Sequence, residues 1–99
     1  MTIAVVHDPV AQEFFAEVDG LRAVLQYRYA QGIMSVVHTG VPAALANRGI
    51  AADLTQTALE FARAQGWKVN PVCAYTRAFL QKHAGYDDLL VTRYSAGAR

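Results

Sequence analysis

Residues 40–54 read GVPAALANRGIAADL and mark the point at which the periodicity of the chain changes. From Ile50 onward, apolar residues recur at the spacing of one helical face, through Leu54 and Ala58. Gly66 then follows as a typical helix stop. The pattern therefore predicts a helix that begins near residue 50 and ends just before this glycine.

Strands are predicted on both sides of this helix. Residues 33–39, IMSVVHT, are apolar on both faces, which is typical of a central strand covered on both sides. Residues 67–72, WKVNPV, read as a short strand, and a strand–helix–strand unit makes its two strands parallel with a right-handed crossover. Pro71 has no N–H for a sheet hydrogen bond, so either this strand lies at an edge or the two strands splay apart here.

The first part of the chain predicts an antiparallel meander. Its elements are, in order, an edge strand over 2–6 broken by His7-Asp8-Pro9, a strand over 12–18, a turn at Asp19-Gly20, an alternating strand over 21–29 and a second turn at 30–32. A second helix is predicted over about residues 74–83. Together these elements predict an α/β (α+β) fold with a mixed, mostly antiparallel sheet, one βαβ unit and two helices.

Length and composition limit the possible classes of protein. The 99 residues fit a single domain over 1–99, in which the small and polar residues 92–99 are expected to form a flexible tail. A hydrophobic fraction of 54% indicates a folded chain, and a net charge of +1 with scattered Lys and Arg argues against nucleic-acid binding. With one cysteine, no signal pattern and no long apolar run, we expect a cytoplasmic protein that binds no membrane and is a monomer or weak dimer.

The loop before the first helix admits two interpretations. A helix N-terminus presents unpaired N–H groups and the positive end of the helix dipole, which together make an anion site. Gly49 would let a phosphate approach the backbone, Arg48 could add charge, and Asn47 tolerates a positive φ. Alternatively, Asn47 is a plain N-cap whose side chain accepts a hydrogen bond from the N–H of Gly49 or Ile50. From the local pattern alone, capping is the simpler interpretation.

Three segments, taken in order, resemble the minimal branch of the GCN5-related N-acetyltransferase-like family: VVHTGVPAALANRGIAADL, ALEFARAQGWKVNPVCAY and HAGYDDLL. In that branch a strand ending in His-Thr leads to Val-Pro or a similar pair, a Gly-x-Gly-Ile-Ala/Gly loop opens the main helix, and a Lys-Val/Ile-x-Pro-x-Cys strand follows. The match runs from Phe14 to Leu90. Asn47 departs from it by replacing a glycine, and Ala46 by replacing the Gln or Arg of the wider superfamily.

The resemblance implies a co-substrate, acetyl-coenzyme A, held where two nearly parallel strands splay. Its pantetheine arm would pair with the end of the first parallel strand, and its pyrophosphate would rest on the start of the main helix. The residues expected to contact it are Thr39, Val41, Asn47, Arg48, Gly49, Ile50 and Ala51. The implied activity is acetyl transfer to an amine of a small molecule or peptide. Two alternatives remain: a non-catalytic acyl-coenzyme A binding or regulatory module, and an interaction domain with a merely capped helix.

Cys73 falls where the family's cysteine falls, at the end of the second parallel strand and the start of the second helix. A helix start lowers the pKa of a thiol, so Cys73 could act as general acid or as acyl-accepting nucleophile, or it could be a small buried residue. We predict direct transfer with Cys73 as the acid. Tyr75 is the alternative proton donor. No histidine has a second ligand at metal spacing, so we predict no metal site.

Overall fold

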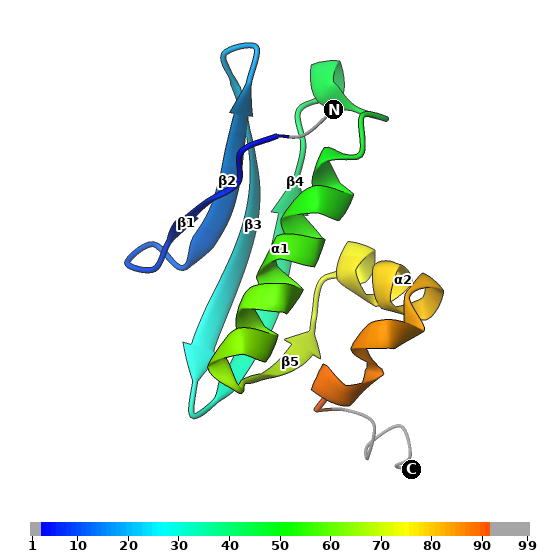
Figure 1. Ribbon diagram of the computed structural model, residues 1–99. Helices are drawn as coiled ribbons and strands as arrows, with labels where there is room; N and C mark the ends of the chain where they lie inside the picture. The colour runs from blue at the N-terminus through cyan, green and yellow to red at the C-terminus, as the bar shows by residue number, and fades with distance from the viewer. Residues whose placement is uncertain (1–2, 92–99) are drawn as a thin grey trace.

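The computed structural model describes residues 3–91 and contains one sheet, with its two α-helices packed on one face (Figure 1). The elements are β1 Val6–Asp8, β2 Glu13–Val18, β3 Leu21–Ala30, β4 Ile33–Gly40, α1 Ile50–Gln65, β5 Lys68–Pro71 and α2 Ala74–Lys82, with short 3-10 helices η1 Ala43–Leu45 and η2 Ala84–Leu89. Within the described residues, none of the helices is long and apolar enough to cross a membrane. The tail predicted over 92–99 lies outside the described part of the chain.

The sheet confirms the predicted topology. Its order is β1-β2-β3-β4-β5, in which the first four strands pair antiparallel and β4 pairs with β5 in parallel. Asp19 and Gly20 have φ angles of 54° and 75°, as a type I′ hairpin requires. Helix α1 supplies the crossover between the parallel strands, so the single predicted βαβ unit is present.

The first strand lies later in the chain than predicted. His7 and Asp8, which were expected to break a strand over 2–6, are themselves part of β1 and pair with Phe14 and Glu13. The reason is tertiary packing, because the His7 ring stacks on Phe14 at 4.2 Å and shares a 2.6 Å hydrogen bond with the Tyr27 hydroxyl. These contacts outweigh the local preference of the His-Asp-Pro sequence for a turn.

The core lies between one face of the sheet and the helices. Its buried side chains include Phe14, Ala23, Leu25, Met34 and Val36 from the strands and Leu54, Ala58, Leu59, Phe79 and Leu80 from the helices. No helix or strand among residues 3–91 packs on the opposite face of the sheet, so the prediction that residues 33–39 are covered on both sides is wrong. Val37 is 37% exposed and His38 is also exposed, because α1 and α2 pack on the other face. Apolar residues on both faces of a strand did not, in this case, require two covering layers.

The two parallel strands pair over four residues and then separate. Pairing runs from Ile33 opposite Lys68 to Val36 opposite Pro71. The Cys73 N–H still donates to the Val36 carbonyl at 2.8 Å, after which the chain turns into α2. Strand β4 continues to Gly40 alongside β3. Both explanations offered for Pro71 therefore hold, since β5 is the last strand of the sheet and it diverges from β4 at this proline.

Candidate functional site

The start of α1 has an open backbone. Its N-cap is Gly49, which adopts a left-handed conformation with φ 78° and ψ 12°, and no side chain within the described residues caps the helix. Asn47 also has a positive φ, 66°, as expected, but it lies two residues before the N-cap. The interpretation of Asn47 as a side-chain cap is therefore wrong. The first helical N–H groups after Gly49 consequently face outward without a side-chain acceptor.

A pocket of about 340 Å³ lies at this helix start. Its lining residues are Val41, Leu45, Ala46, Asn47, Gly49, Ile50, Ala51, Ala52 and Tyr75. The loop that forms its wall is anchored by Leu45, which is buried and donates its N–H to the Pro42 carbonyl at 2.8 Å. The structure thus brings five of the seven predicted coenzyme-contacting residues together with Tyr75 from α2.

Arg48 lies in the same loop but does not line the pocket. Its guanidinium donates to the carboxylate of Asp19 at 3.1 Å and so ties the loop to the turn between β2 and β3. Both side chains are largely exposed, and such a pair contributes about 0–1 kcal/mol. In this arrangement the positive charge of Arg48 is directed to the hairpin and away from the helix start.

Thr39 and Cys73 meet across the gap between the diverging strands. The Cys73 thiol donates to the Thr39 hydroxyl at 3.6 Å, which connects the end of β4 to the start of α2. Cys73 is the N-cap of α2 and is partly buried. Burial raises the pKa of the thiol, but the backbone of Thr76, the hydroxyls of Thr39 and Thr76 and the backbone of Tyr75 together outweigh it, so the pKa is lower than that of an ordinary thiol. The Cys73 thiol makes no cap hydrogen bond of ordinary geometry, yet it lies near enough to these donors for them to favour its charged form.

Tyr75 stands in the first turn of α2 and is 38% exposed. Besides the pocket at the helix start, it lines a second hollow of about 200 Å³ between α1 and α2, together with Ala52, Ala78, Phe79, Lys82 and His83. Ala52 and Tyr75 line both hollows, so the two adjoin each other along α1 and α2, and we refer to them together as the groove between these helices. Burial raises the pKa of the Tyr75 hydroxyl, which keeps it protonated at neutral pH.

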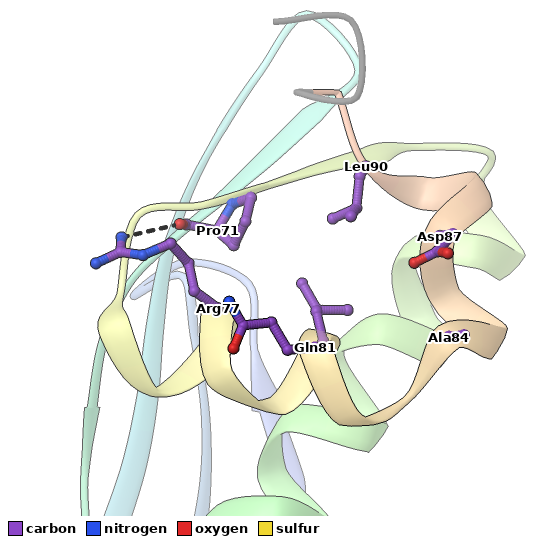
Figure 2. A pocket seen from close by; sticks show the side chains of 7 residues that line it. Pro71, Arg77, Gln81, Ala84, Asp87 and Leu90 are labelled. Carbon is purple, nitrogen blue, oxygen red and sulfur yellow. Dashed lines mark hydrogen bonds between the residues drawn. The ribbon is translucent and has the colours of Figure 1, made fainter. Parts of the chain in front are cut away.

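Arg77 was not singled out from the sequence, although it fixes the segment that carries Cys73. Its guanidinium donates to the carbonyl of Pro71 (Figure 2) and also to that of Val72, and so reaches back over the connection between β5 and α2. It also lines a pocket of about 370 Å³ on the opposite face of α2, with Pro71, Leu80, Gln81, Ala84, Asp87 and Leu90. In the sequence, this role of Arg77 was indicated only by its place four residues after Cys73, and that spacing is common in helices.

Potential metal ligands do not gather in this region. Across residues 3–91, His, Cys, Asp and Glu side chains form no group of three or more that could hold a metal ion. The groups offered by the site are backbone N–H groups, hydroxyls and one thiol. Such a site can bind an anion and move a proton.

Comparison with known proteins identifies the family to which this fold belongs. The profile of the GCN5-related N-acetyl-transferase family matches residues 13–89, from β2 to η2. The chain is 34% identical to Protein NATD1 of Gallus gallus over 84 residues, which cover 82% of this chain and 76% of that protein. Protein NATD1 of Homo sapiens is also 34% identical, over 82% of this chain and 74% of its own length.

A solved structure supports the fold. The solution structure of a GCN5-like protein from Staphylococcus aureus matches with a TM-score of 0.71 over 90% of this chain and 88% of that chain, at 24% identity. At that identity the similarity concerns the fold alone, whereas the matched family profile spans the loop at the start of α1 and the cysteine after β5. The chain therefore belongs to the GCN5-related N-acetyltransferase family.

Proposed function

We propose that this protein binds acetyl-coenzyme A and transfers its acetyl group to an amine of a small molecule or peptide. The observation that carries the proposal is the pocket at the start of α1, where backbone N–H groups have no side-chain cap in the described structure. The positive end of the helix dipole and these N–H groups attract a pyrophosphate. Gly49 has no atom within 4 Å of the position that a Cβ would take, so the backbone is open to close approach.

The diverging strands support a path for the pantetheine arm. Strand β4 runs on for four residues beyond its last pairing with β5, and its end at Thr39 and Gly40 leads into Val41 of the pocket. An extended pantetheine arm lying in this gap would hydrogen-bond the β4 backbone where β5 no longer pairs with it. Its thioester would then lie near Thr39 and Cys73, the two side chains that meet across the gap.

The groove between α1 and α2 suits the nucleotide end of the coenzyme. It continues from the pocket past Tyr75 to His83, whose exposed ring stacks on the buried Phe79 at 4.0 Å and offers a flat surface for an adenine ring. Lys82 lines the same groove, and its ammonium group makes no ion pair within residues 3–91. We assign Lys82 to the 3′-phosphate.

The proposed reaction is direct transfer. The amine nitrogen attacks the thioester carbonyl, the carbon–sulfur bond breaks, and the departing coenzyme A sulfur takes the proton of the Cys73 thiol. The resulting Cys73 thiolate takes up the proton that the new amide nitrogen loses, so the thiol is restored. The cleft contributes mainly by aligning thioester and amine. Tyr75, whose hydroxyl is protonated at neutral pH, is the alternative donor.

A non-catalytic acyl-coenzyme A binding module is the second candidate. The resemblance to the wider superfamily implies a tyrosine of the second helix as the acid. One observation favours a non-catalytic module, because the side chains nearest that place, Phe79 and Leu80, are buried and carry no hydroxyl. Transfer to any amine would exclude this candidate.

Thermal unfolding with acetyl-coenzyme A and coenzyme A tests binding. A ligand at a hundred times its dissociation constant adds about 2.7 kcal/mol of stability, which raises the Tm of a domain of this size by roughly 10 °C or more. No shift with either compound at millimolar concentration would refute the proposal. Release of free thiol from acetyl-coenzyme A, measured against a panel of amines, then tests for transfer.

A further inference from the structure

Thr76 has a buried hydroxyl with no hydrogen-bond partner. Its side chain is 0% exposed, and its Oγ1 is unpaired within the described residues. The other fully buried threonine, Thr55, behaves in the ordinary way and donates to the Ala51 carbonyl at 2.8 Å. Leaving a buried hydroxyl unsatisfied is destabilising, so a residue of this kind calls for an explanation.

The local geometry explains why the hydroxyl lacks a partner. Thr55 donates to the carbonyl four residues earlier, and the corresponding carbonyl for Thr76 is that of Val72. The Val72 carbonyl accepts from the guanidinium of Arg77 and not from Thr76. Thr76 lies three residues after Cys73, the N-cap of α2, and residues at that spacing are neighbours on a helix. In agreement with this placement, the backbone and the hydroxyl of Thr76 both lower the pKa of the Cys73 thiol.

The sulfur of Cys73 therefore has the Thr39 hydroxyl at hydrogen-bond distance and the unpaired Thr76 hydroxyl in the same turn of α2. A neutral thiol has one hydrogen, and it is directed to Thr39 at 3.6 Å. A thiolate has no hydrogen and accepts from several donors, so it could satisfy Thr39 and Thr76 together.

We propose that Thr76 is a positioning residue that, together with Thr39, holds the sulfur of Cys73 and stabilises the thiolate formed when Cys73 gives its proton to the departing sulfur of coenzyme A. The inference rests on the proposed function, because that function makes Cys73 the proton donor. In this step one S–H bond breaks at Cys73 and one forms on the coenzyme. Thr76 donates a hydrogen bond and keeps its own proton.

The ionisation of Cys73 provides a direct test, because it is the single cysteine of the chain. The rate of alkylation by iodoacetamide is measured from pH 5.5 to 10, and the midpoint of the profile gives the pKa of the thiol. Thr76→Val replaces the hydroxyl with a methyl group of similar size. We expect it to raise the midpoint by roughly one pH unit, equivalent to about 1.4 kcal/mol, and to slow alkylation at neutral pH about tenfold. Thr76→Ser, which keeps a hydroxyl, should retain the wild-type midpoint.

Thr55→Val is the matched control, because it removes a buried threonine hydroxyl from α1 and should leave the profile unchanged. The Tm separates positioning from structure: Thr76→Val should unfold at the wild-type temperature or higher, since it removes an unsatisfied group. An unchanged midpoint in Thr76→Val, or the same shift in Thr55→Val, would overturn the inference. If Thr76→Val fails to fold, Thr76→Ala is measured against the same criteria. None of these measurements uses coenzyme A, so the inference and the proposed function can fail separately.

Discussion

Replacing Gly49 with valine should weaken coenzyme A binding at least tenfold, whereas the same change at Gly66 should not. Gly49 is the N-cap and Gly66 the C-cap of α1, and their φ angles are nearly equal, at 78° and 76°. Neither has a heavy atom within 4 Å of an added Cβ, so both substitutions act through the backbone without a clash. Forcing an ordinary residue into the left-handed region costs about 1–2 kcal/mol, which lowers the Tm of a domain of this size by roughly 5–15 °C. Both variants should show this loss.

Binding separates the two variants because Gly49 lines the pocket and Gly66 lies at the far end of α1. The valine side chain at position 49 would occupy the space assigned to the pyrophosphate. We expect the dissociation constant for coenzyme A to rise at least tenfold, about 1.4 kcal/mol, in Gly49→Val and to stay at the wild-type value in Gly66→Val. Isothermal titration calorimetry at a temperature where circular dichroism shows both variants folded measures this difference. Equal affinities in the two variants would mean that the pyrophosphate binds elsewhere.

Three further predictions follow from the site and the core. Cys73→Ala should keep coenzyme A binding and lower acetyl transfer by roughly 10²-fold, as for the loss of one proton donor. Full activity would instead make Cys73 a small core residue and leave Tyr75 or water as the donor, and an acetyl adduct on Cys73 that intact-mass measurement detects and an added amine removes would contradict direct transfer. Lys82→Ala should weaken coenzyme A several-fold and 3′-dephospho-coenzyme A not at all, with Arg28→Ala on the open sheet face as the charge-matched control; an equal effect on both ligands would remove Lys82 from the nucleotide site. Burial lowers the pKa of His7 from its ordinary 6.5 despite the opposing charge of Asp8, so the unfolded chain binds the proton more readily than the folded one. The Tm should therefore fall as the pH drops below about 6.5. His7→Phe should flatten this dependence of the Tm on pH, and an unchanged slope would assign the dependence to other groups.

The sheet could be predicted from the sequence because its signals are local. Alternation from Leu21 to Tyr29 and the Asp19-Gly20 turn determine a hairpin with little help from the rest of the chain. The change to helical spacing at Ile50 and the glycine after Gln65 determine the ends of α1. Each of these patterns lies within a few residues, and the structure reproduces them almost to the residue.

The errors fall where distant contacts decide the outcome. Nothing near His7 in the sequence indicates that it stacks on Phe14 and bonds Tyr27, and those contacts make β1. The open face of β4 could not be read from its own residues either, because the covering layer is a property of the helices. Arg48 shows the same limit, since its partner Asp19 is 29 residues away in the sequence and only the fold brings the two together.

The environment of Cys73 shows why the position of a site can be predicted while its chemistry cannot. The sequence places Cys73 at the end of a short strand and the start of the second helix, and in the structure it is the N-cap of α2. Its acidity, however, depends on Thr39 of β4, which lies 34 residues earlier, and on Thr76 of α2, whose hydroxyl has no hydrogen-bond partner in the described structure. The Cys73 N–H donates to the Val36 carbonyl at the point where the parallel strands stop pairing, and Cys73 is also the N-cap of α2. The separation of the strands and the proposed stabilisation of the thiolate therefore meet at one residue. Any change that restored pairing beyond Pro71 should close the gap for the coenzyme.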